Sequence, residues 1–137
     1  MNAHPHIATF VAECEDLLAQ LEEATLVLGA GDAEAVHLTF RIFHTIKGGA
    51  AMVGLPEIAG FTHHVESVLD LARAGAITAS PALVDAVLGA KDHIAALLAA
   101  SGGGPAVDPD AGPALLAHLA ALAGSRTLAA APAAAAP

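Results

Sequence analysis

Apolar residues recur three and four positions apart along most of this sequence, and glycine or proline separates one such stretch from the next. This spacing places the apolar side chains on one face of an α-helix, whereas a half-buried strand needs strict alternation. Four long helices joined by short turns pack most simply as an up-down antiparallel bundle, with a fifth helix as a C-terminal accessory. The helices are predicted over residues 5–29, 33–53, 57–74, 81–100 and 113–123.

Residues with strong positional preferences mark where these helices begin and end. Gly29 suits the end of the first helix, and Asp32 suits the N-terminal cap of the second. Pro56 fits the first turn of the third helix, and the Ser80-Pro81 pair fits the start of the fourth. The boundaries therefore agree with the apolar pattern.

The composition favours an all-α fold. Alanine, the strongest helix former, supplies 36 of the 137 residues, Tyr and Trp are absent, and there are four Phe. Residues 101–113 are rich in Gly and Pro and lack an apolar period, which predicts an irregular connection. We therefore expect one domain over residues 1–124 and an Ala/Pro-rich linker or disordered tail over residues 125–137.

The charge and the cysteine content argue against several functional classes. The formal net charge is −9, with five Lys and Arg against 14 Asp and Glu, which opposes binding to a nucleic-acid backbone. Cys14 is the only cysteine, so neither an intrachain disulfide nor a cysteine zinc cage can form. No apolar stretch reaches the roughly 20 residues that span a bilayer. We expect no membrane partner and a cytoplasmic location.

The second predicted helix carries a histidine, a lysine and two adjacent glycines on or near one flank. At 100° per residue, His44, Lys47 and Gly48 lie together and away from the apolar stripe. Each helical glycine costs about 1 kcal/mol relative to alanine. We expect Gly48 to leave room for a reactant beside His44, unless the helix ends there with Gly48 as its cap. The apolar stripe comprises Val36, Phe40, Phe43, Ile46, Ala50 and Val53.

The third predicted helix carries a second group of polar residues. His63 and Glu66 are three residues apart and share a face. Antiparallel packing through the short preceding turn places the middle of this helix beside the middle of the second. We therefore expect His44, Lys47, His63 and Glu66 to converge. The other histidines expected on the surface are His4, His6, His37, His93 and His118.

Such a cluster suits a nucleophilic imidazole. An unperturbed histidine has a pKa near ~6.5, so much of it is neutral at pH 7 and carries a nitrogen lone pair. A hydrogen bond from one ring N–H to Glu66 leaves the other nitrogen free and aimed outward. Lys47 offers positive charge to an arriving phosphoryl group, whose transfer requires mainly positioning and charge compensation.

The run from Ile42 to Ala50, followed by His63 and Glu66 at their spacing, closely resembles the histidine phosphotransfer (HPt) domain at the N-terminus of the chemotaxis histidine kinase CheA. The likeness covers about residues 7–124 and includes the acidic first helix. The resemblance implies a five-helix fold in which His44 is the phosphoacceptor, commonly through its ε nitrogen.

The resemblance also implies roles for the neighbours of His44 and for other domains. Lys47, His63 and Glu66 would form its hydrogen-bonding network, and Gly48 would provide clearance for a docking partner. The phosphoryl group would come from ATP, used with Mg²⁺ by a separate histidine kinase catalytic domain. It would pass to an aspartate on response regulator receiver domains of the CheY or CheB kind. No segment resembles an ATP site, so no cofactor is expected on this chain itself.

Two other functions stay open on the sequence alone. His44, His63 and Glu66 could form a two-histidine, one-carboxylate metal site, although Lys47 would repel a divalent cation. The bundle could instead be a non-catalytic adaptor whose acidic first helix contacts a basic partner.

Overall fold

The computed structural model describes residues 5–30 and 32–125, and these residues form five helices and no strand. The helices are α1 (Pro5–Leu28), α2 (Ala33–Met52), α3 (Pro56–Arg73), α4 (Pro81–Ser101) and α5 (Ala111–Gly124). The predicted all-α fold is confirmed, and each helix begins and ends within two residues of its expected bounds. None of these helices is both long and apolar enough to cross a membrane. Residues 126–137 of the expected tail lie outside the described residues.

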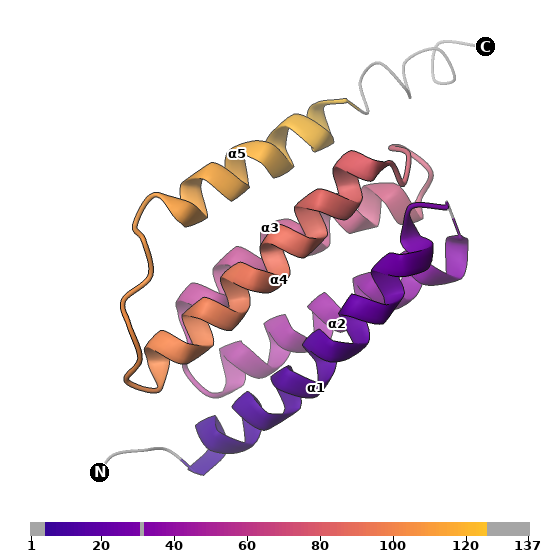
Figure 1. Cartoon of the computed structure of the whole chain (residues 1–137). Helices are drawn as coiled ribbons and strands as arrows, with labels where there is room; N and C mark the ends of the chain where they lie inside the picture. The colour runs from indigo at the N-terminus through magenta and orange to yellow at the C-terminus, as the bar shows by residue number, and fades with distance from the viewer. Residues whose placement is uncertain (1–4, 31, 126–137) are drawn as a thin grey trace, which may run out of the picture.

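The first four helices surround a common core, and the fifth packs on the outside of α3 and α4 and contributes the buried Leu119 to that core (Figure 1). α2 packs between α1 and α3, and α4 closes the group by packing against the same two helices. α5 follows the connection over residues 102–110 and packs on α3 and α4. The two helices that carry the expected site, α2 and α3, are therefore direct neighbours.

Side-chain caps begin two of the helices where the sequence predicts them. An Asp32 carboxylate oxygen accepts a hydrogen bond of 2.9 Å from the backbone N–H of Glu34. The Ser80 hydroxyl oxygen accepts one of 3.3 Å from the N–H of Leu83. Each cap satisfies a first-turn N–H that has no partner within its own helix.

A three-residue turn joins α2 to α3 and makes them antiparallel. Gly54 has a φ of 79°, a left-handed conformation that residues with a side chain rarely adopt. The N–H of Leu55 then donates to the carbonyl of Ala50 at 2.9 Å, which satisfies the end of α2. This tight reversal sets His44 and Glu66 at the same depth in the bundle.

The core fixes the rotation of α2 and α3 about their axes. Phe43 and Ile46 of α2 are fully buried, as are Val65 and Leu69 of α3. A helix turns by 100° per residue, so the residue that follows Phe43 must lie on a flank of α2. The apolar stripes therefore determine which polar side chains face the groove between the two helices.

Cys14 belongs to this core rather than to a reactive site. Its side chain is fully buried on α1. Burial, together with the neighbouring carboxylates of Glu13 and Glu15, raises the pKa of the Cys14 thiol to about 12. The thiol therefore stays protonated at neutral pH and packs as a small apolar group.

Candidate functional site

His44 stands on the outward flank of α2, beside the groove between α2 and α3. Its side chain is 62% exposed, although the preceding residue, Phe43, is fully buried. One step of the helix is enough to separate the two side chains. The imidazole is therefore anchored on a rigid helix and open to an approaching molecule.

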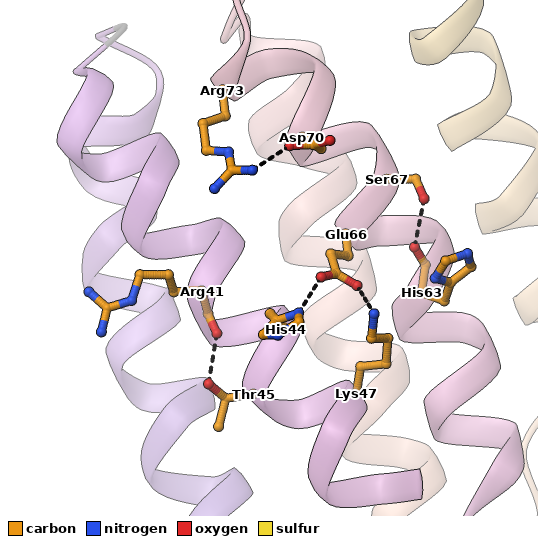
Figure 2. Close-up of polar contacts among 9 residues, drawn as sticks. All are labelled: Arg41, His44, Thr45, Lys47, His63, Glu66, Ser67, Asp70 and Arg73. Atoms are coloured by element: carbon orange, nitrogen blue, oxygen red, sulfur yellow. Dashed lines mark hydrogen bonds and ion pairs between the residues drawn. The ribbon is translucent and has the colours of Figure 1, made fainter.

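Glu66 of α3 binds both predicted α2 partners with its two carboxylate oxygens (Figure 2). Oε2 lies 2.5 Å from Nδ1 of His44, and Oε1 lies 2.5 Å from Nζ of Lys47. The Glu66 side chain is only 10% exposed, whereas that of Lys47 is 29% exposed. Three of the four expected site residues therefore converge across the α2–α3 interface.

The contact with Glu66 determines which ring nitrogen is available. An ionised carboxylate only accepts hydrogen bonds, so Nδ1 of His44 carries the hydrogen and donates it. In a neutral ring the lone pair is then on Nε2, which points away from Glu66 across the imidazole. The exposed side of His44 therefore presents a nucleophilic nitrogen.

Glu66 remains ionised to a lower pH than an ordinary glutamate. Burial by itself raises the pKa of this carboxyl group, because it disfavours the charged form. Hydrogen bonds from Lys47 and His44, with the charges of the same two groups, outweigh burial and hold the pKa of Glu66 below its usual value. The carboxylate that both partners require is therefore present throughout the neutral range.

Positive side chains gather around His44 on a protein whose net charge is −9. Arg41 and Lys47 lie about one turn before and after it on α2, and Arg73 reaches toward α2 from the end of α3 (Figure 2). Lys47 pairs with Glu66, and Arg73 pairs with Asp70 at 2.6 Å. Glu66 and Asp70 each offset one of these charges, so the surroundings of His44 are close to neutral on a strongly acidic chain.

The two glycines after Lys47 have different surroundings. A Cβ at Gly48 would meet no atom within 4 Å, so the space one turn beyond His44 is open. A Cβ at Gly49 would lie 2.7 Å from the Phe10 ring of α1, which is too close for packed atoms. α2 continues through both glycines to Met52, so the interpretation of Gly48 as a helix cap is wrong.

We expect alanine at these two positions to change stability in opposite directions. Gly48→Ala should raise the free energy of unfolding by about 0.5–1 kcal/mol, because alanine is the better helix former and its methyl group meets open space. Gly49→Ala should lower it by about 1–3 kcal/mol, because the methyl group displaces the buried Phe10 ring. Urea unfolding followed by circular dichroism measures both. Equal changes would contradict the packing role of Gly49.

His63 lies apart from the other three expected site residues. Its ring points away from Glu66 (Figure 2) and faces the ring of His64, with the two centroids 5.9 Å apart. Within the described part of the chain, no polar contact joins His63 to His44, Lys47 or Glu66. The part of His63 in the hydrogen-bonding network stays a prediction from the resemblance.

The metal-site alternative lacks a complete set of ligands. It needs His44, His63 and Glu66 together, but the His63 ring is turned away and the Lys47 ammonium occupies one oxygen of Glu66. Across residues 5–30 and 32–125, no three His, Cys, Asp or Glu side chains are grouped to hold a metal ion. The geometry therefore does not support this alternative.

Phe40 is a neighbour of His44 and Arg73 is a neighbour of Phe40, and the sequence pattern predicts neither residue at the site. The apolar stripe predicts Phe40 in the core, but Phe40 is only half-buried and its ring stacks with that of His44. The Arg73 guanidinium carbon lies 3.9 Å from the centre of the Phe40 ring. The i, i+4 spacing of Phe40 and His44 was a signal for the first contact. No local pattern predicts the second, because it joins two helices.

His93 is buried, which corrects its expected surface position. It is 9% exposed, and its ring packs edge-on against Phe61 with centroids 4.5 Å apart. α5 covers it closely, since a Cβ at Gly112 would lie 3.3 Å from Nε2 of His93. Burial lowers the pKa of His93 against a smaller opposing effect of the Glu57 carboxylate. His93 therefore packs beneath α5, against Phe61, and is not part of the His44 site.

Comparisons with known proteins agree on one family. The Hpt domain family model matches residues 7–125. Over 99 residues, the chain is 43% identical to the chemotaxis protein CheA of Treponema pallidum (strain Nichols), covering 70% of this chain and 12% of that protein. The CheA proteins of Rhizobium meliloti (strain 1021) and Cereibacter sphaeroides are 37% and 38% identical, covering 83% and 75% of this chain. The match spans only 15% and 16% of those two proteins.

Proposed function

The chain belongs to the Hpt domain family, and we propose that His44 is the residue that accepts its phosphoryl group and passes it on. The family and the chemotaxis relatives make the chain a histidine phosphotransfer module of two-component signalling. One observation supports the assignment of His44: its imidazole is exposed, and its Nδ1 binds Glu66. The Glu66 carboxylate also binds Lys47.

In the first step, Nε2 of His44 attacks the γ-phosphorus of ATP, which a separate kinase domain binds with Mg²⁺. The N–P bond forms while the bond from phosphorus to the β–γ bridging oxygen breaks, and ADP leaves with that electron pair. The imidazole gains positive charge as Nε2 gives up its lone pair. The Glu66 carboxylate compensates that charge through the Nδ1 hydrogen.

In the second step, the phosphoryl group moves to an aspartate on a receiver domain of the CheY or CheB kind. A carboxylate oxygen of the aspartate attacks the phosphorus, and the P–N bond breaks as Nε2 recovers its electron pair. The ring that leaves is the one still bound to Glu66, so it resumes its starting tautomer. Both partner domains are proposals, since the matched relatives are about six to eight times longer than their matched segments.

Lys47 and Gly48 support both steps in different ways. The Lys47 ammonium lies one turn from His44 and offers positive charge to the phosphoryl oxygens. The Lys47 ammonium is already paired with Glu66, so it should affect the transition state more than the binding of partners. Gly48 leaves open space on the side from which a partner domain must approach.

The test is transfer of radiolabelled phosphate. The chain is incubated with a CheA-type kinase domain that has no Hpt domain of its own, labelled ATP and Mg²⁺, and a receiver domain is added afterwards. We expect acid-labile, base-stable phosphate on the chain that then moves to the receiver. An adaptor bundle would acquire no such label under the same conditions, which would overturn the proposal.

A further inference from the structure

The His44 ring has a second neighbour besides Glu66, the aromatic ring of Phe40 one turn earlier on α2. The rings of Phe40 and His44 are nearly parallel, with an interplanar angle of 11° and centroids 6.0 Å apart. Helical side chains lean toward the N-terminus of their helix, so His44 extends over the turn that carries Phe40. Glu66 therefore holds one edge of the imidazole while Phe40 limits its tilt.

Phe40 is itself held from α3. The Arg73 guanidinium carbon lies 3.9 Å from the Phe40 ring centre, within the range of a cation–π contact. A planar guanidinium stacks on an aromatic face better than a lysine ammonium does. Asp70, one turn before Arg73 on α3, accepts a hydrogen bond of 2.6 Å from Nη2. Arg73 thus bridges from α3 to the Phe40 ring of α2, one turn before His44.

We propose that Phe40 and Arg73 are positioning residues for phosphoryl transfer, which restrict the His44 ring so that Nε2 keeps one outward direction. The inference rests on the proposed function of His44. It adds a role for an aromatic ring and an arginine that the hydrogen-bonding network does not include.

The exposure of His44 is the reason that such a restraint matters. A side chain that is 62% exposed has few packing contacts to restrict its rotation, and a single hydrogen bond at Nδ1 leaves the ring free to swing about that contact. Reaction requires the nucleophile to lie close to phosphorus and in line with the leaving oxygen. Because Glu66 binds one edge of the ring and Phe40 stacks with it, the His44 imidazole populates one orientation more often.

The experiment separates loss of the ring from loss of its support. Phe40→Leu removes the aromatic face, Phe40→Tyr keeps it, and Arg73→Gln removes the guanidinium from an exposed position. Arg41→Gln is the matched control, because it also removes one positive charge near His44 but leaves the cation–π contact that Arg73 makes with Phe40. Two quantities are measured, namely phosphorylation kinetics with a kinase domain and the ¹³C relaxation order parameter of the His44 ring.

We expect Phe40→Leu to lower kcat for phosphorylation about 3- to 10-fold with little change in the KM for the chain, because the ring is less often aligned. Phe40→Tyr should stay within about 2-fold of the wild type, and Arg73→Gln should lower kcat about 2- to 5-fold. The order parameter of the His44 ring should fall in Phe40→Leu and Arg73→Gln but not in Arg41→Gln.

Failure of this inference is distinguishable from failure of the proposed function. If the wild-type chain acquires no label, His44 is not a phosphoacceptor and both ideas fall. If the wild type is labelled but ring order and kcat are unchanged in Arg73→Gln and Phe40→Leu, only the positioning role is overturned. A higher KM with unchanged kcat would assign these residues to docking instead. Should Phe40→Leu not fold, the exposed Arg73→Gln variant decides by the same two measurements.

Discussion

Replacing His44 by glutamine is expected to reduce phosphorylation to background while leaving the bundle folded. A glutamine amide is not nucleophilic enough to form an N–P bond, and the neighbouring Glu66 and Lys47 cannot replace the missing imidazole. The imidazole is mostly exposed, and Glu66 keeps its ion pair with Lys47, so the folded state loses little. Acid-labile radiolabel measures the loss of phosphorylation, and circular dichroism on the same sample measures whether the helices remain folded.

The matched control is His37→Gln, which changes an exposed histidine two turns earlier on α2. We expect this variant to retain wild-type labelling. Acid-labile phosphate that persists in His44→Gln would move the phosphoacceptor to another histidine. Loss of label in both variants would point to a damaged docking face rather than to loss of the nucleophile.

The sequence predicts most of the fold because each step depends on neighbours along the chain. The apolar stripe through Phe43 and Ile46 fixes the inward face of α2, and the cap at Asp32 fixes its start. Gly54, with its positive φ, allows the tight turn between α2 and α3. Such local signals are sufficient to place His44 beside Glu66 at matching depth.

What the sequence does not predict depends on distances between helices. The closeness of Gly49 to Phe10 follows from how tightly α1 lies on α2, which no single-helix pattern encodes. The burial of His93 depends on α5, whose short stripe does not say where it docks. His63 and Glu66 are on the same helix, yet their rotamers direct the imidazole ring and the carboxylate away from each other. Helical spacing thus limits which face a residue occupies but not which atom it reaches.

The second large effect is expected at Glu66. Glu66→Ala removes the acceptor for Nδ1 of His44 and leaves the Lys47 ammonium without its carboxylate, so we expect phosphorylation to slow on the order of 100-fold. Glu66→Gln keeps an oxygen that accepts from Nδ1 but no charge, and should slow it on the order of 10-fold. Initial rates with a kinase domain give both values. Equal rates in the two variants would contradict a role for the charge itself.

The pH dependence of stability tests the same carboxylate without any partner domain. Hydrogen bonds and charges from Lys47 and His44 hold the pKa of Glu66 below its usual value in the folded protein, while the unfolded chain has the usual value near ~4.3. Glu66 therefore contributes stability above the unfolded pKa, and this contribution is lost as pH falls through the lower folded pKa. The difference in unfolding free energy between wild type and Glu66→Gln should shrink as the solution is acidified from pH 6 toward pH 3. A difference that stays constant over this range would mean that the ionised carboxylate does not bind its two partners more strongly than a neutral amide does.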